Sequence, residues 1–162
     1  MINREIIFII SSAIVLVILN YAIFEKENLK NQGDTVFLAL APVDPRSLMQ
    51  GDYMALRYEI ERKVTTLPEK LSHGYAVIEL DQNKVGSFKR FYQDGEMLAT
   101  NEKLLRYHRE HSSIRIVPNA FFFQEGHAQI YQNAKYGEFK FDKSGHHLLI
   151  GLADKDLKSI QP

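Results

Sequence analysis

The sequence predicts a mainly β protein, in which a single N-terminal transmembrane helix precedes one β-rich domain with one or two short helices. Residues 6–24 carry no charge and are long enough to span a bilayer. About 130 further residues suffice for one domain with its own core. The chain has 10 Phe and 8 Tyr residues, and aromatic side chains suit half-buried strands. We therefore expect an anchor at residues 1–24, a juxtamembrane linker at 25–34 and a β-rich domain at 35–162.

The apolar N-terminal run is expected to remain as a membrane anchor. At a rise of about 1.5 Å per residue, a helix over residues 6–24 approaches the roughly 30 Å hydrocarbon core. A buried soluble helix is rarely apolar on every face, so a core helix is the weaker interpretation. Cleavage as a signal peptide needs small residues at positions −3 and −1, and the best local candidate places Asn20 at −3. The anchor is therefore expected to stay attached.

Charge does not determine the orientation of this anchor. Arg4 and the amino terminus precede the span, whereas Lys26 and Lys30 follow it, so the positive-inside rule gives no clear answer. Because so short a tail precedes the span, we expect it to stay cytoplasmic and the domain to be exported. The expected location is the inner membrane, with the domain in the periplasm of a Gram-negative cell.

The pattern after the anchor indicates strands. Residues 25–34 are charged and end in Gly-Asp, which indicates a juxtamembrane linker or a frayed helix end. Residues 53–60 alternate, with Met54, Leu56 and Tyr58 on one face of a half-buried strand. Short helices are expected at 67–72 and 102–109, and one plausible helix lies between the glycines of 126–137. The expected strands are 35–41, 53–60, 75–80, 85–92, 113–117, 120–124, 138–142 and 147–153.

Composition argues against several classes of function. Lys plus Arg and Asp plus Glu both number 20, so no excess positive charge favours nucleic acid. Without cysteine the chain has no disulfide, thiolate metal site or cysteine nucleophile. His108 with His111, and His146 with His147, lack an identifiable third ligand, and adjacent strand residues point to opposite faces. We expect surface histidines, no bound metal and no cofactor.

Residues 51–58 read GDYMALRY and match the pattern Gly-Asp-Tyr-x-x-Leu-x-Tyr at every specified position. The chain here resembles the GDYXXLXY family of membrane-anchored proteins. The resemblance implies no particular chemistry, but it implies an accessory protein that accompanies a polytopic membrane protein. Further segments similar to that family are PVDPRSLMQ (42–50), FFFQEG (121–126), AKYGEFKF (134–141) and LLIGLADKDL (148–157).

The motif itself has a structural and a functional interpretation. In the structural one, the glycine permits a tight turn, the aspartate caps its backbone donors, and the leucine and second tyrosine point into a core. In the functional one, the first tyrosine and the arginine on the other face contact a partner. The candidate residues are Gly51, Asp52, Tyr53, Leu56, Arg57 and Tyr58.

The order of several segments is similar to that in type I signal peptidases, namely RSLMQGD (46–52), FKRFYQDGE (88–96), FFFQEG (121–126), KYG (135–137) and LIGLA (149–153). This resemblance implies a signal-peptidase-like β fold as one option. The position of the peptidases' serine falls on Val43, which has no hydroxyl, although Lys89 falls on that of their general base.

Catalysis would have to use Ser47, which lies four residues from the position that corresponds to the peptidases' serine. Lys89 would also have to lie near Ser47 in its uncharged form. The alternative is that Lys89 is solvated or paired with an acid such as Glu96. No catalytic residue is expected, and Ser47 and Lys89 are the pair to test if the protein is a peptidase.

Three aromatic residues in a row, Phe121, Phe122 and Phe123, are expected in a strand buried on both faces, with an exposed Phe122 for docking as the alternative. Three functions remain open. The first is a non-enzymatic accessory protein that binds the bilayer and an integral membrane protein. The second is a divergent Ser/Lys peptidase. The third is a sensor of small ligands or glycans that uses Tyr53 and Arg57.

Overall fold

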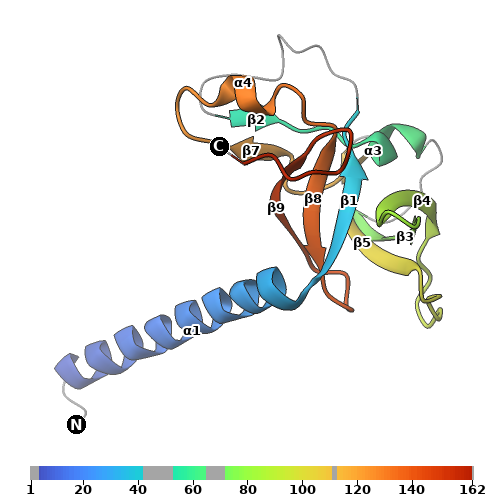
Figure 1. Ribbon diagram of the computed structural model, residues 1–162. Coiled ribbons are helices and arrows are strands. Elements are labelled where there is room, and N and C mark those ends of the chain that lie inside the picture. Colours follow the sequence, from blue (N-terminus) through green and yellow to red (C-terminus); the bar gives the residue numbers. More distant parts are fainter. Residues whose placement is uncertain (1–3, 42–52, 65–71, 111–112, 162) are drawn as a thin grey trace.

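The computed structural model describes residues 4–41, 53–64, 72–110 and 113–161, and shows a long helix that projects from a β-rich domain (Figure 1). The described elements are α1 (Arg4–Gln32), β1 (Asp34–Ala39), β2 (Tyr53–Ala55), α3 (Glu59–Lys63), β3 (His73–Leu80), β4 (Val85–Phe91), β5 (Glu102–Glu110), β6 (Ser113–Arg115), β7 (Ala120–Phe122), α4 (Ala128–Tyr131), β8 (Tyr136–Phe141) and β9 (His147–Ala153). The protein is mainly β, as the sequence predicts.

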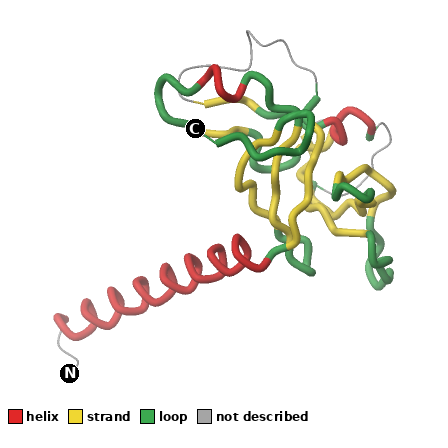
Figure 2. Tube along the Cα trace, in the orientation of Figure 1, coloured by secondary structure: helices red, strands yellow, loops and turns green. Residues whose placement is uncertain are grey.

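Seven of the strands form one curled sheet in the order β6-β5-β3-β4-β1-β8-β9. β1 runs parallel to β4, and the other neighbours in this sheet are antiparallel. β2 and β7 form a separate antiparallel pair, which lies at the end of the domain away from α1 (Figures 1 and 2). Because β1 lies between β4 and β8, it joins the two halves of the main sheet.

The core forms where alternating strands turn their apolar residues inward. In β8, Phe139 and Phe141 are buried while Glu138 and Lys140 are not, which is the period-2 pattern of a half-buried strand. Gly137 continues the inward row, and a Cβ there would lie 3.0 Å from the Phe139 ring and 3.2 Å from the Tyr58 ring. The absence of a side chain at Gly137 therefore allows β8 to pack closely against Tyr58. The buried cluster comprises Val36, Leu38, Met54, Leu56, Tyr58, Ile60, Val64, Ala76, Ile78, Leu105, Tyr107, Ile114, Ile116, Tyr131, Phe139, Phe141 and Leu152.

Helix α1 confirms the expected apolar span and is longer than expected. None of its residues is buried, and it is long and apolar enough to cross a membrane. The helix continues through residues 25–32, so the charged segment is a helix end and not an irregular linker. It stops at Gly33, where a Cβ would lie 2.5 Å from the carbonyl oxygen of Leu29. The domain is thus joined to the span by continuous helix.

The helix expected at residues 102–109 is wrong, because this segment is strand β5. Leu105 and Tyr107 are buried while Arg106 and His108 are exposed, which is a strand pattern flanked by helix-favouring charged residues. Pairing with β3 along its length decides the conformation. Local propensity is a weak guide where a long ladder of backbone hydrogen bonds is available.

The strand expected at residues 53–60 is only partly correct. Its buried face is as expected, since Met54, Leu56 and Tyr58 are all buried, but β2 ends at Ala55 and α3 begins at Glu59. Glu59 pairs with Lys63 at helical spacing, with 3.0 Å between the charged atoms. The strand is therefore shorter than its alternating pattern predicts, and a helical turn follows it.

The remaining differences are smaller. The helix expected between the glycines of 126–137 is reduced to α4, and its last residues belong to β8. The helix expected at 67–72 lies almost wholly outside the described residues. The other expected strands are found within a few residues of their expected bounds.

Candidate functional site

The described part of the GDYMALRY motif is built into the core. Leu56 is 2% exposed, and its backbone N–H donates to the carbonyl of Asn119 at 2.8 Å. Arg57 is exposed, and its carbonyl accepts a hydrogen bond from the N–H of Ala41. The motif therefore connects the end of β1 to the loop before β7. Gly51 and Asp52 lie outside the described residues, as does Ser47.

Tyr58 is the most completely enclosed residue of the motif. Its side chain is fully buried, its ring packs against Phe139 with 5.6 Å between ring centroids, and its hydroxyl donates to the carbonyl of Pro118 at 2.7 Å. Burial, with a smaller contribution from the Glu61 carboxylate, raises the pKa of Tyr58 well above its usual value. The hydroxyl therefore stays protonated and acts as a structural donor.

The other face of the motif carries an aromatic pair. The Tyr53 ring lies 5.7 Å from that of Phe122 across the β2–β7 pair. Phe122 is 75% exposed, whereas Phe121 and Phe123 pack on Tyr131. The expectation that all three phenylalanines are buried is wrong, because β7 has the two-residue period and turns its middle residue outward.

Lys89 is held by two carboxylates. Its amine lies 2.8 Å from Glu79 and 3.0 Å from Glu102. The hydrogen bond to Glu79, and then that to Glu102, raises the pKa of Lys89 above its usual value. A general base needs an uncharged amine at neutral pH, so these contacts oppose that role. The expected alternative partner, Glu96, instead pairs with Arg90.

A β-bulge explains how neighbouring basic residues reach the same acid. Adjacent strand residues normally point to opposite faces, yet Lys89 and Arg90 both contact Glu102. In the register of β3 against β4, Val77 opposes Arg90 and Ile78 opposes Phe88, which leaves Lys89 as the extra residue. Arg90 and the backbone N–H of Ala99 are the largest causes that lower the pKa of Glu102, to about 2. This arrangement stabilises the strands and leaves the lysine charged.

The histidines do not gather into a metal site within the described ranges. His146 is exposed and lies 2.9 Å from Asp142. His147 is not a surface histidine as expected, because its ring stacks on Phe141 and its Nε2 lies 2.8 Å from the carbonyl oxygen of Val117. Burial lowers the pKa of His147 and favours its neutral form.

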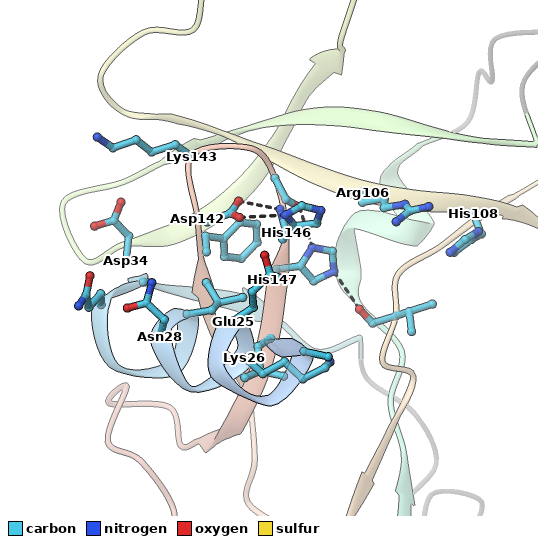
Figure 3. A pocket seen from close by; sticks show the side chains of 18 residues that line it. Glu25, Lys26, Asn28, Asp34, Arg106, His108, Asp142, Lys143, His146 and His147 are labelled. Atoms are coloured by element: carbon cyan, nitrogen blue, oxygen red, sulfur yellow. Dashed lines mark hydrogen bonds and ion pairs between the residues drawn. The ribbon is translucent and has the colours of Figure 1, made fainter. Parts of the chain in front are cut away.

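A pocket of about 720 Å³ lies between the C-terminal part of α1 and the domain (Figure 3). Residues 22–34 form one wall. The turn between β8 and β9, together with Arg106 and His108 of β5, forms the other. Neither Tyr53 nor Arg57 lines it. Segments distant in the chain meet here, around His146 and His147.

The pocket carries more unpaired cations than unpaired acids. Of its three acids, Asp34 forms an ion pair with Lys103, Asp142 is hydrogen-bonded to Ser144 and His146, and Glu25 has no ion pair among the described residues. Lys26, Arg106 and Lys143 also line it, and no ion pair engages them in the described part of the chain. No local sequence pattern predicts this pocket. The basic residues that follow the anchor are the part of the pocket visible in the local sequence. The β8–β9 turn and β5, which form the other wall, are remote from the anchor in sequence.

A family model described as GDYXXLXY protein matches residues 15–152, from within the apolar span to the last strand. Comparison with curated proteins and with solved structures gave no match. The similarity to signal peptidases therefore stays a prediction. Since the family match covers most of the sequence and includes the motif described above, the chain belongs to the GDYXXLXY family.

Proposed function

We propose that this protein is a membrane-anchored, non-enzymatic accessory protein of the bacterial envelope, with its domain outside the cytoplasm, and that it binds an integral membrane protein. The observation that carries the proposal is the surface of α1. No residue of this helix is buried against the domain, so its apolar surface is available to lipid and to another transmembrane helix.

The polar groups of the span support contact with another helix. Ser11 donates to the carbonyl of Phe8, and Asn20 donates one amide N–H to that of Leu16, so the Asn20 side-chain oxygen keeps its acceptor capacity for a neighbouring helix. Association of such a helix depends on close packing with its neighbour. A partner that itself crosses the bilayer would supply that neighbour.

The state of Lys89 favours a binding role over proteolysis. Its amine is charged and shared between Glu79 and Glu102, whereas a Ser/Lys peptidase needs a lysine that can accept a proton from its serine. The sensor alternative receives no support from Tyr53 and Arg57, since neither lines the pocket.

Recovery of the full-length protein from native membranes in mild detergent tests the proposal. We expect a stoichiometric integral membrane protein to accompany it. The matched variant replaces residues 6–24 with a leucine-alanine span of equal length and keeps the domain. This variant should anchor normally but lose the partner, because packing depends on the shape of the helix surface.

One result would contradict the proposed function, and another would move the proposed contact from α1 to the domain. Absence of any stoichiometric membrane partner across several growth conditions would contradict the accessory role. Equal recovery by wild type and by the span variant would place the contact on the domain, and Phe122→Ser would then test the exposed aromatic residue of β7.

A further inference from the structure

The pocket beside α1 lies at the depth of the lipid headgroups. The apolar run ends at Phe24, and Ala22, Glu25 and Lys26 line the part of the pocket nearest to it. The helical residues 25–32 extend roughly 12 Å beyond the apolar run, whereas the headgroup layer on each side of the bilayer is roughly 5–8 Å thick. When α1 spans the membrane, the pocket therefore begins within the headgroups and continues just above them.

The cations that border this pocket come from three separate elements. Lys26 lies on α1, Arg106 on β5 and Lys143 on the turn between β8 and β9. Figure 3 shows Lys143 and Arg106 on opposite sides of the His146–Asp142 pair, with Lys26 below them on the helix. Because Lys103 offsets the charge of Asp34, these three cations face only Glu25 and Asp142, and the balance of charge favours an anion.

The wall of the pocket also has an apolar part. Ala22 and Leu29 of α1 line the pocket together with Leu148 of β9. Ala22 belongs to the apolar run itself, which ends at Phe24, so the pocket reaches down to the span. A soluble anion gains no binding energy from an apolar surface. An amphiphile can place its acyl chains along α1 and its headgroup among the cations.

We propose that this pocket binds the anionic headgroup of a membrane phospholipid from the leaflet in which α1 emerges. The phosphate oxygens accept charge-assisted hydrogen bonds from Arg106, Lys143 and Lys26, and the acyl chains lie against the helix. Such a lipid fixes the domain at one height and tilt relative to the bilayer. The proposal does not depend on the accessory function, since it concerns lipid alone.

Native mass spectrometry of the full-length protein in detergent, with defined lipids added, measures this preference. The probes are phosphatidylglycerol, which is anionic, and phosphatidylcholine, which has the same chains and no net charge. We expect phosphatidylglycerol to bind at least about tenfold more tightly. The variant Arg106→Gln with Lys143→Gln should lose roughly 25-fold in affinity for it, at roughly fivefold per cation.

The matched control is Lys155→Gln with Lys158→Gln, which removes two exposed cations that do not line the pocket. This control should bind phosphatidylglycerol as the wild type does. Equal binding of the two lipids by the wild type would overturn the proposal. So would equal affinity of the pocket variant and the control variant for phosphatidylglycerol.

A single-residue variant and a soluble competitor complete the test. If the double variant fails to fold, Lys26→Gln on the exposed helix surface removes a pocket cation without touching the domain core, and it should lose roughly fivefold. Inorganic phosphate provides the soluble competitor. Full displacement of phosphatidylglycerol by low millimolar phosphate would identify a site for a soluble anion and contradict the lipid assignment.

Discussion

Tyr58 connects parts of the domain that are far apart in the sequence. Its ring touches Phe139 of β8, its hydroxyl binds Pro118 before β7, and its backbone forms an isolated bridge with Leu40 after β1. A tyrosine fits this position because an aromatic ring fills the core while its hydroxyl satisfies a carbonyl. Packing and one hydrogen bond therefore account for a tyrosine at this position of the motif.

We expect Tyr58→Phe to lower the free energy of unfolding by about 1–3 kcal/mol, because the Pro118 carbonyl would lose its buried donor. Denaturant unfolding of the full chain in detergent, followed by circular dichroism, measures the change. Tyr92→Phe is the control, since no hydrogen bond engages that hydroxyl among the described residues. Equal midpoints for both variants would contradict the structural role of the Tyr58 hydroxyl.

The lowered pKa of His147 predicts a pH dependence of stability. Burial is the main cause, and His146 and Arg106 nearby also lower it. The unfolded chain then binds more protons than the folded one, so this contribution is fully present above about pH 6.5 and decreases as the pH falls toward the folded pKa. In His147→Gln, the loss of stability between about pH 6.5 and 5 should be smaller than in wild type. An unchanged slope would contradict the assignment.

At the scale of elements, the turn between β8 and β9 determines how this hairpin meets the rest of the sheet. Asp142 accepts hydrogen bonds from the backbone N–H groups of Ser144 and His146, both at 2.8 Å. Gly145 has φ +89°, and a Cβ there would lie 2.8 Å from the Cβ of Leu104. The glycine therefore permits both the turn and its close contact with β5.

A pair of glycine substitutions separates these two effects. Gly126 also has a positive φ, +85°, but nothing lies within 4 Å of its added Cβ. We expect Gly126→Ala to destabilise by about 1 kcal/mol through the backbone alone. Gly145→Ala should cost about 2–3 kcal/mol, because the contact with β5 must also shift. Thermal unfolding of both variants compares them, and equal losses would mean that the β5 contact contributes nothing.

At the scale of the whole molecule, continuous helix joins the span to the domain. α1 runs from Arg4 to Gln32 without a break, and the first strand begins at Asp34. The domain is thus held close to the surface on which the helix emerges. Which side of the membrane this is determines what the pocket and the β2–β7 face can meet.

The absence of cysteine makes the orientation directly measurable. Met97 is 91% exposed in the segment between β4 and β5, so Met97→Cys is a reporter of the domain. We expect a membrane-impermeant maleimide to label it in intact spheroplasts. Glu5→Cys, ahead of the apolar run, is the control and should react only after lysis. The reverse pattern would place the domain in the cytoplasm.

Local patterns were enough for part of this architecture. An uncharged run of 19 residues indicates a span, and the alternation of Met54, Leu56 and Tyr58 gives the correct buried face even though β2 is short. Both signals come from residues close together in the chain, where solvent preference and side-chain geometry act directly. Membership of the family is also a property of the sequence itself.

The features that depend on distant segments follow from contacts made in the folded chain. Residues 102–110 become a strand because β3 supplies a partner, and the bulge at Lys89 commits its amine to Glu79 and Glu102. The pocket exists because the end of α1, β5 and the β8–β9 turn meet in space. Backbone pairing and ion pairing between remote segments leave no local periodic signal, and for that reason the sequence alone determined the anchor and the core face but not the pocket.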